Sequence, residues 1–407
     1  MGRNTATGTA TLTVALCFLA ALIEGLDIVA PGLVAPQIAD AFGLGPAQVG
    51  WLFSASTVGL LLGALQGGWL ADRVGRKRVL IGSMVTFGAM SILTALATTT
   101  SILFLGRFLV GVGLGGALPN LIALSAEAGP KEGRTTRVTL MYSGVPLGGA
   151  LGGAIALWGG ASENWRILFF VGGGAPIVLA VALALLLSES PLFAQLSSSA
   201  RTSGSRTLPA LFGPGTAAVT LFMWVSFCGT LLILYLFTNW LPLLFVNAGF
   251  SRREASIATM VFNIGGAVGA AGLGRWMDRG HGPRVMLTCF SAMGAAIVAL
   301  FLSFRIEGVG LVVASAAAFA VGVFVIGTQL VLYGVAPGYY QTRVRATGVG
   351  AAVAAGRVGS IVGPLLAGSM LGAGANAAGV VTAMLPVVAV AGLAAVALLR
   401  RPALAEP

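Results

Sequence analysis

Two carboxylates lie in a stretch of the sequence that is otherwise apolar. Glu24 and Asp27 occur within "LIEGLDIVAP", residues 22–31. They are three positions apart, so in a helix they share one face. Two neighbouring carboxylates in a low-dielectric environment cannot readily both ionise, and we expect them to titrate as a coupled pair. Such a pair can load a proton on one side of a barrier and release it on the other. The alternative is that one acid only neutralises a nearby cation.

Two arginines are candidates for that cation. Arg107 lies several residues inside one apolar segment, and Arg357 lies near the middle of another, amid Gly and Ala. An arginine in a membrane helix costs about 2.5–3.5 kcal/mol on insertion scales, so it usually faces an interior cavity and has a partner. For Arg107 the alternative is a side chain that snorkels to the interface. We expect Arg357 to meet an anion, either a protein carboxylate or a negatively charged substrate.

The elements that hold these residues must be membrane helices. The chain has 407 residues, of which 57% are hydrophobic and 9% charged, and its mean hydropathy is +0.96. A soluble domain carries about 25% charged residues, so lipid must be the solvent for much of this chain. The net charge of +11 does not indicate a nucleic-acid partner, because the basic residues lie mostly in short gaps between apolar segments.

A bilayer core needs roughly 20 apolar residues per spanning helix. The sequence contains twelve segments of about that length, and they are apolar all round, which favours helices over barrel strands. We therefore predict an all-α membrane protein. The twelve segments cover about 10–33, 48–71, 79–98, 102–125, 138–160, 166–188, 215–242, 254–275, 285–304, 308–335, 346–370 and 376–399.

The basic residues predict the orientation. Most of the 23 Lys and Arg fall in gaps on one side, whereas the other side holds Arg166, Arg252, Arg253 and Arg305. By the positive-inside rule both termini are cytoplasmic. The first segment is long for a signal peptide and contains two acids, so we interpret it as a retained helix.

The sequence divides into two related halves. A Ser-, Pro- and Gly-rich gap at 191–207 reads as a cytoplasmic linker between a bundle at 1–190 and a bundle at 208–407, each of six helices. "GGWLADRVGRKRV" at 67–79 recurs in part as "GRWMDRGHGPRV" at 274–285, about half the chain later. Parallel repeats of this kind are typical of transporters that rock two bundles around a central site.

The repeated stretch is the most specific motif in the chain. An acid at a helix end beside arginines can form a charge network that holds one conformation and breaks in another; the alternative is a solvated loop. Here the sequence resembles the major facilitator superfamily, with its loop pattern G-x-L-x-D-R-x-G-R-K/R. The resemblance implies two pseudo-symmetric bundles and a cytoplasmic gate. The gate residues are Asp72, Arg73, Gly75, Arg76, Lys77, Asp278 and Arg279. The second copy has His281 and Gly282 where the first has Gly75 and Arg76, which implies a looser clasp there.

Longer stretches are similar to a narrower family. "EGLD", "GVGLGGALPNLIALSAEAGPKEGRTTRVTLMYSGVPLGGALGG" and "RATGVGAAVAAGRVGSIVGPLLAG" resemble the aromatic acid:proton symporters, and within them the hydroxyphenylpropionate branch. That family more often has D-G-x-D where this chain has Glu24. The resemblance implies import of an aromatic carboxylate, such as a hydroxyphenylpropionate, benzoate or hydroxybenzoate, with protons, and involves Glu24, Asp27, Arg107 and Asp72.

Polar and aromatic residues within the predicted helices are candidates for contacts with such a ring. They are Asn120, Tyr142, Asn239, Trp240, Asn263, Gln329 and Tyr333; for each alone, helix packing or an interfacial position is the competing interpretation. We expect no cofactor and no metal, with the proton gradient as the energy source. The expected setting is a bacterial inner membrane, where the protein acts as a monomer.

Two alternatives remain. A drug:proton antiporter of the same superfamily usually carries G-x-x-x-G-P-x-x-G-G in its fifth helix, and "SGVPLGGALGG" matches that pattern imperfectly. The second alternative, a membrane sensor or a membrane-embedded enzyme, is disfavoured. The longest polar gap is the linker, which offers no soluble signalling domain, and the sequence has no HExxH, no paired CxxC and no phosphate-binding glycine loop after a strand. Cys17, Cys228 and Cys289 lie in apolar segments, where packing is the expected role.

Overall fold

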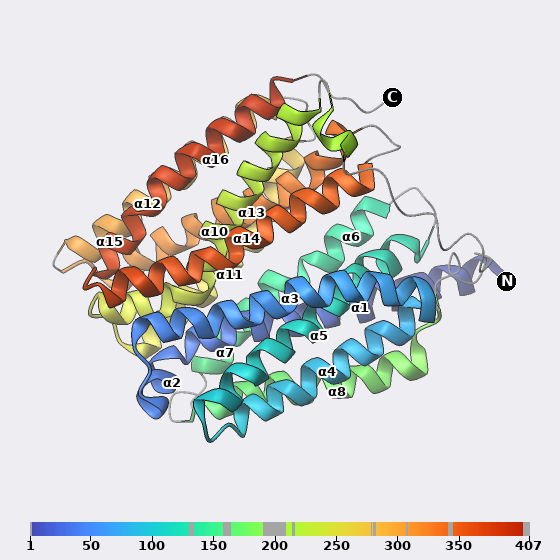
Figure 1. The fold of residues 1–407 in the computed structure, drawn as a ribbon, viewed down its shortest axis with the longest axis horizontal. Coiled ribbons are helices and arrows are strands. Elements are labelled where there is room, and N and C mark those ends of the chain that lie inside the picture. Colours follow the sequence, from blue (N-terminus) through green and yellow to red (C-terminus); the bar gives the residue numbers. More distant parts are fainter. Residues whose placement is uncertain are drawn as a thin grey trace. The chain divides into compact units, whose positions relative to one another are not determined.

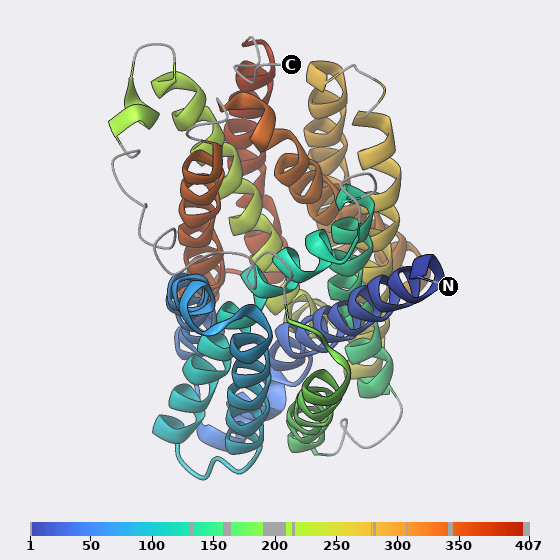
Figure 2. The ribbon, with the colours of Figure 1, turned by 90° about the vertical axis from the view of Figure 1, so that its right-hand side faces the viewer.

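The fold consists of helices. The computed structural model describes residues 2–129, 134–157, 164–189, 209–213, 216–277, 279, 282–306, 308–340 and 345–401, and these contain helices and no strand (Figure 1, Figure 2). Twelve stretches of the described residues are long and apolar enough to cross a membrane, from Ala10–Leu33 to Ala377–Leu399. The predicted all-α membrane fold is confirmed.

The chain forms two compact units. The first contains Met1–Gly43 and Ala55–Ser203, and the second contains Leu44–Ser54 and Gly204–Pro407. The linker predicted at 191–207 lies outside the described residues. Up to residue 189 the helices are α1 (Gly2–Leu33), α2 (Ala35–Phe42), α3 (Pro46–Val74), α4 (Arg76–Ala95), α5 (Thr100–Glu127), α6 (Arg134–Tyr142), α7 (Gly144–Leu157) and α8 (Arg166–Leu186). From residue 209 they are η2 (Pro209–Phe212), α10 (Ala217–Asn247), α11 (Arg252–Met277), α12 (Gly282–Arg305), α13 (Leu311–Val335), η3 (Ala336–Tyr339), α14 (Arg345–Gly372), α15 (Ala377–Thr382) and α16 (Met384–Leu399).

Two predicted spans are interrupted. The segment predicted at 138–160 comprises α6 and α7, which meet at Ser143. Pro146, three residues after Ser143, has no N–H to bond the carbonyl of Tyr142, which interrupts regular helix bonding at this point. The last span is divided in the same way between α15 and α16, where Pro386 lies three residues after the break at Ala383. Pro31 lies inside the last turn of α1, and Pro36 is the second residue of α2.

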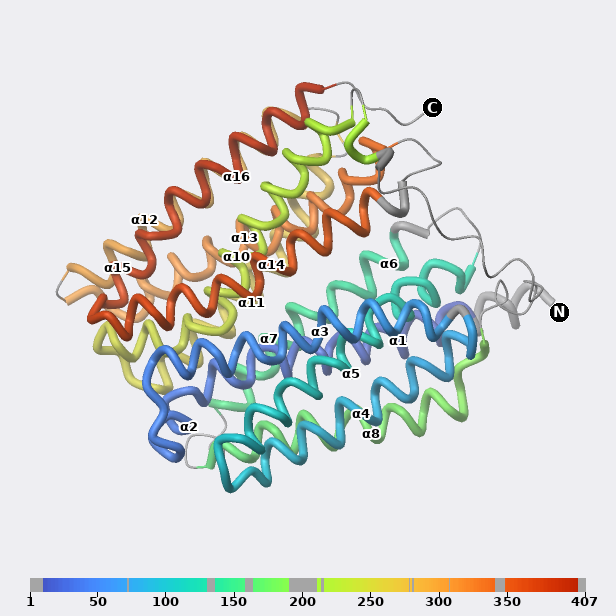
Figure 3. Tube along the Cα trace, in the orientation of Figure 1, coloured from blue at the N-terminus to red at the C-terminus, as the bar shows by residue number. Residues whose placement is uncertain are grey.

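Glycines bring the helices of the first unit into backbone contact. A Cβ added at Gly25 or Gly148 would collide with a backbone carbonyl across the α1–α7 contact. A Cβ added at Gly63 or Gly111 would likewise collide with a backbone carbonyl across the contact between α3 and α5. Small residues are enriched at such contacts because lipid offers no hydrophobic drive for association, so close packing must supply the energy. Another close pair of the same unit, α4 and α8, runs side by side in the trace (Figure 3).

The second unit repeats this pattern. Gly359 and Gly363 of α14 meet backbone carbonyls of α10, and Gly269 and Gly322 hold α11 against α13. Thus the first and fifth spans of each half pair through glycines, and so do the second and fourth. The weak sequence repeat therefore corresponds to a repeat of helix contacts inside each unit.

Candidate functional site

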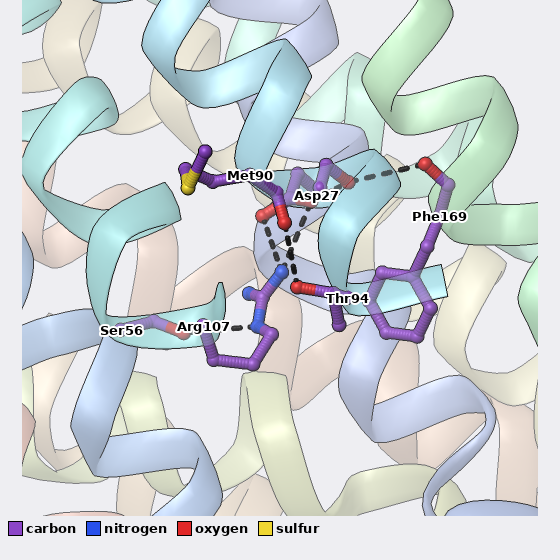
Figure 4. Close-up of polar contacts among 7 residues, drawn as sticks. Asp27, Ser56, Met90, Thr94, Arg107 and Phe169 are labelled. Atoms are coloured by element: carbon purple, nitrogen blue, oxygen red, sulfur yellow. Dashed lines mark hydrogen bonds and ion pairs between the residues drawn. The ribbon is translucent and has the colours of Figure 1, made fainter. Parts of the chain in front are cut away.

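The buried core of the first unit contains an ion pair. Arg107 of α5 donates from Nη1 to both oxygens of Asp27 on α1, at 3.1 Å to Oδ1 and 3.0 Å to Oδ2 (Figure 4). The side chain of Asp27 is 0% exposed and that of Arg107 is 2% exposed. This burial excludes a snorkelling Arg107. The cation predicted from the sequence therefore meets one of the two predicted acids.

Neutral polar groups from other helices complete the cluster. Ser91 of α4 lies 3.3 Å from Asp27 Oδ1 and 3.2 Å from the Phe169 carbonyl of α8. On the other side of the pair, Arg107 Nε donates to the Ser56 hydroxyl at 3.1 Å. The Phe169 ring lies 5.5 Å from the guanidinium carbon. The sequence analysis did not single out these three residues, because their polar atoms converge from helices that are distant in sequence.

Glu24 lies one turn before Asp27 on the same face of α1, and its side chain is also buried. The first unit therefore holds two carboxyls and one guanidinium within a short length of membrane helix. If both acids ionise, the three groups carry a net negative charge in a low-dielectric interior.

The chemistry of this cluster follows from its charges. An intact buried pair is tolerated because each charge compensates the other, and loss of one partner leaves an uncompensated charge at a cost of about 3–5 kcal/mol.

The second unit holds its own buried cation. Arg357 of α14 is 7% exposed, and its Nη1 donates to the Tyr235 hydroxyl of α10 at 2.8 Å. Tyr235 was not among the predicted site residues, since one tyrosine in an apolar helix carries no distinctive signal. A guanidinium has five N–H donors. The bond to Tyr235 takes one of these donors.

Two predicted polar residues of α13 lie beside this cation. Tyr333 interacts electrostatically with Arg357, Tyr235 and Gln329, and its ring packs against Phe227 at 5.3 Å. Gln329 is 2% exposed, and among the described residues neither its amide oxygen nor its amide nitrogen makes a hydrogen bond of good geometry. The nearby Tyr333 hydroxyl thus satisfies Gln329 only in part. A buried amide in this condition costs about 1–3 kcal/mol.

The other predicted polar residues are arranged differently. Asn120 and Asn263 are buried, and each donates its amide N–H to the carbonyl four residues earlier, Gly116 at 2.8 Å and Thr259 at 2.9 Å. Their amide oxygens are the atoms that remain for a ligand. Tyr142, at the end of α6, packs against the apolar core of the first unit.

Within the second unit, Trp240 is fully buried and donates to the Pro364 carbonyl at 3.0 Å. It is therefore a packing residue rather than part of an interfacial belt. Asn239 bonds the Tyr235 carbonyl at 2.8 Å.

The motif at 67–79 forms a sharp corner between α3 and α4. Gly75 alone separates the two helices and has φ +109°, a conformation that favours glycine. The basic residues that follow therefore occupy the first turn of α4 rather than a loop. Positive charge at a helix N-terminus is unfavourable, and carboxylates offset it. Arg76 pairs with Glu127 at the end of α5, and the Lys77 backbone N–H donates to Glu189 Oε1 at 3.1 Å.

The rest of the predicted gate is less fully defined. The side chain of Asp72 and the whole of Asp278 and His281 lie outside the described residues. Arg73 stacks on Trp69 at 3.7 Å, and Arg279 is exposed. Glu127 and Glu189 were missed by the sequence analysis, although "SAEAGPKEG" and "LSES" place both acids at the ends of predicted segments.

Comparisons with known proteins agree on one family. The profile of the Major Facilitator Superfamily matches residues 17–364. The chain is 46% identical over 396 residues to the 3-(3-hydroxy-phenyl)propionate transporter of Escherichia coli, covering 97% of this chain and 96% of that protein. It is 36% identical over 389 residues to the gallate transporter of Pseudomonas putida, covering 89% of this chain and 86% of that protein.

Solved structures show the same fold. The crystal structure of a D-xylose-proton symporter superposes with a TM-score of 0.78 at 17% identity, covering 96% of this chain and 97% of the other. A bacterial homologue of the human lysosomal transporter Spinster, in an inward-facing and occupied conformation, gives 0.75 at 18% identity, with 96% and 97% covered. At such low identity the likeness concerns the fold alone.

Proposed function

The chain belongs to the Major Facilitator Superfamily, and on that premise we propose that it imports an aromatic carboxylate together with protons. It is a multi-pass membrane transporter and not an enzyme, as the relatives and the fold establish. The single observation that carries the finer proposal is the pair of buried cations: Arg107 is held by an acid, and Arg357 by a neutral phenol.

The proposed substrate is an aromatic ring with a carboxylate and a hydroxyl. The relatives named above carry 3-(3-hydroxyphenyl)propionate and gallate, both hydroxylated aromatic acids. In this chain the buried guanidinium of Arg357 binds the carboxylate by charge-assisted hydrogen bonds. The half-buried ring of Tyr333 offers the apolar surface that a benzene ring requires, and Phe227 packs against this ring. Asn120, Tyr142 and Asn263 are weaker candidates for further contacts.

The proposed proton carrier is Asp27. Its protonation ends the ion pair with Arg107 and adds one positive charge to the buried interior. The substrate carboxylate at Arg357 adds one negative charge, so a proton and a monoanion enter together with no net change of charge. Glu24 is protonated in the resting state, so that it adds no charge to the Asp27–Arg107 pair. This assignment accounts for two acids on one face of α1, since each has a separate task.

The proposed transport cycle is alternating access between the two halves. Both termini and the Arg76–Glu127 network face the cytoplasm, as the distribution of Lys and Arg favours. The protein works as a monomer in the bacterial inner membrane. It needs no cofactor, because the proton gradient drives accumulation.

Uptake into proteoliposomes tests the function. Purified protein is reconstituted with an alkaline interior, and labelled 3-(3-hydroxyphenyl)propionate, gallate and benzoate are supplied outside. We expect accumulation of at least one acid above its external concentration, abolished by a protonophore. Accumulation driven only by the opposite gradient would identify an antiporter, and accumulation that survives the protonophore would exclude proton coupling.

A further inference from the structure

One hydroxyl in the ion-pair cluster faces two acceptors. Ser91 Oγ lies 3.3 Å from Asp27 Oδ1 and 3.2 Å from the backbone carbonyl of Phe169. The side chain is fully buried. A serine hydroxyl has a single proton, so it can donate to only one of these oxygens at a time, while its lone pairs can accept a bond from elsewhere.

The helices around Ser91 hold its side chain in place. α4 and α8 approach each other closely, as the space at Gly173 shows: a Cβ added there would lie 2.7 Å from the Gly88 carbonyl. The space beside the serine is not crowded: a Cβ at Gly172 would lie 3.6 Å from both Ser91 Oγ and Asp27 Oδ1. Rotation of the hydroxyl proton needs no movement of heavy atoms.

We propose that Ser91 is a positioning residue that stabilises Asp27 in both of its protonation states. When Asp27 is ionised, Ser91 donates to Oδ1. When Asp27 takes up a proton, its carboxyl O–H donates to Ser91 Oγ, and Ser91 turns its own proton to the Phe169 carbonyl. The buried carboxyl thus has a partner before and after proton uptake. This inference rests on the proposed role of Asp27 as the proton carrier.

The remaining groups around Asp27 define what else acts on its charge. From α5 comes Arg107, and from the preceding turn of α1 comes Glu24. α7 has no charged residue, and Arg137 of α6 donates to the Ser125 and Ala126 carbonyls of α5. The contacts from α4 and α8 are neutral. After proton uptake Arg107 keeps its bond to Ser56 at 3.1 Å, so the guanidinium stays in position.

The two states of Asp27 depend on the serine unequally. Ionised Asp27 retains two contacts from Arg107 without Ser91, whereas the neutral carboxyl depends on Ser91 as acceptor for its proton. Removal of the hydroxyl therefore disfavours the protonated form. We expect S91A to need more acid than the wild type for half-maximal uptake, with a shift of about one pH unit, equivalent to a tenfold loss of proton affinity.

The test compares S91A, S91T and T94A in proteoliposomes. Thr94 is a matched control, since it is buried on the same helix and its hydroxyl donates at 2.8 Å to the Met90 carbonyl of its own helix. S91A should shift the pH midpoint of uptake downward, while S91T, which keeps a hydroxyl, and T94A should stay near the wild type. A midpoint in S91A equal to that of T94A, or a shift upward, would overturn the inference.

Infrared difference spectroscopy separates this inference from the proposed function. The carbonyl band of protonated Asp27 is identified by its absence in D27N and needs no transport for its detection. The band should move to higher frequency in S91A and remain in place in T94A. An unmoved band overturns the role of Ser91, even if uptake is proton-driven. Uptake that does not depend on the pH gradient would overturn the proposed function instead. If S91A does not fold, S91C, with its weak S–H donor, should give the same direction of change.

Discussion

A single nitrogen of Arg107, Nη1, bonds both carboxylate oxygens of Asp27. The contact is therefore one charge bridging two oxygens rather than a two-pronged fork. A lysine ammonium could make the same bridge. What lysine lacks is a second nitrogen for Ser56, which Arg107 reaches through Nε at 3.1 Å.

This geometry predicts a graded series at position 107. R107A leaves Asp27 buried without its partner, and thermal unfolding in detergent should show a loss of about 3–5 kcal/mol. R107K should lie between R107A and the wild type. The double variant D27N/R107A removes both charges and should recover most of the stability lost in R107A. Failure to recover would mean that the pair does not set the energy of this site.

The two acids of α1 should respond differently to neutralisation. D27N cannot cycle a proton, so it should lose accumulation driven by a pH gradient but still exchange external for internal substrate. E24Q resembles protonated Glu24 and should keep gradient-driven accumulation at a lower rate. The measurement is paired uptake and counterflow with each purified variant. The reverse outcome would move the proton-carrying role to Glu24.

Arg357 should determine recognition of the carboxylate. R357A should weaken the apparent affinity for the acid at least tenfold, because charge-assisted hydrogen bonds are worth about 1.5–3 kcal/mol each. Y235F removes only the hydroxyl that orients Arg357, and about 1 kcal/mol, or roughly fivefold in affinity, should be lost. The neutral amide of the same acid serves as control ligand, and its competition should be equal in wild type and R357A. Equal losses for acid and amide would assign Arg357 a structural role.

Substitution of Gln329 should affect both the stability of the protein and its discrimination between substrates. Its buried amide makes no well-formed hydrogen bond among the described residues, so Q329L should raise stability by about 1–3 kcal/mol, the cost of the unsatisfied group. If the amide meets the ring hydroxyl of the substrate, Q329L should also lose discrimination between hydroxylated and unsubstituted aromatic acids. A stabilised variant with unchanged discrimination would show that Gln329 does not contact the ring.

Adjacent glycines of α3 provide a test of the packing. A Cβ at Gly67 would lie 2.6 Å from the Gly116 Cα of α5, whereas one at Gly68 meets nothing within 4 Å. G67A should therefore lower the unfolding temperature and the yield of folded protein. G68A should be neutral or stabilising by up to about 1 kcal/mol, since alanine favours helix over glycine. Similar effects of both substitutions would contradict the close approach of α3 and α5.

The sequence predicted the elements better than the contacts between them. Apolar runs of about 20 residues determine a span locally, so twelve spans were recognisable, and so was the cost of Glu24, Asp27 and Arg107. The break at Ser143 was missed, because Pro146 interrupts the helix without changing the apolar character of the segment. Arg107 was a predicted candidate to pair with an acid of the first span, but the neutral partners of the charged groups were missed. Tyr235 lies more than one hundred residues from Arg357, and only the folded chain brings such groups together.

The glycine contacts have a consequence for how such a protein diversifies. Where helices pack backbone against backbone, the contact requires glycine, which has no side chain. The residues that determine the packing therefore differ from the polar residues that determine the chemistry. The positions proposed to contact the substrate, such as Gln329 and Tyr333, can be exchanged without disturbing the contacts at Gly359 or Gly63. Related transporters can therefore change their substrate specificity by a few polar substitutions while the helix packing stays the same.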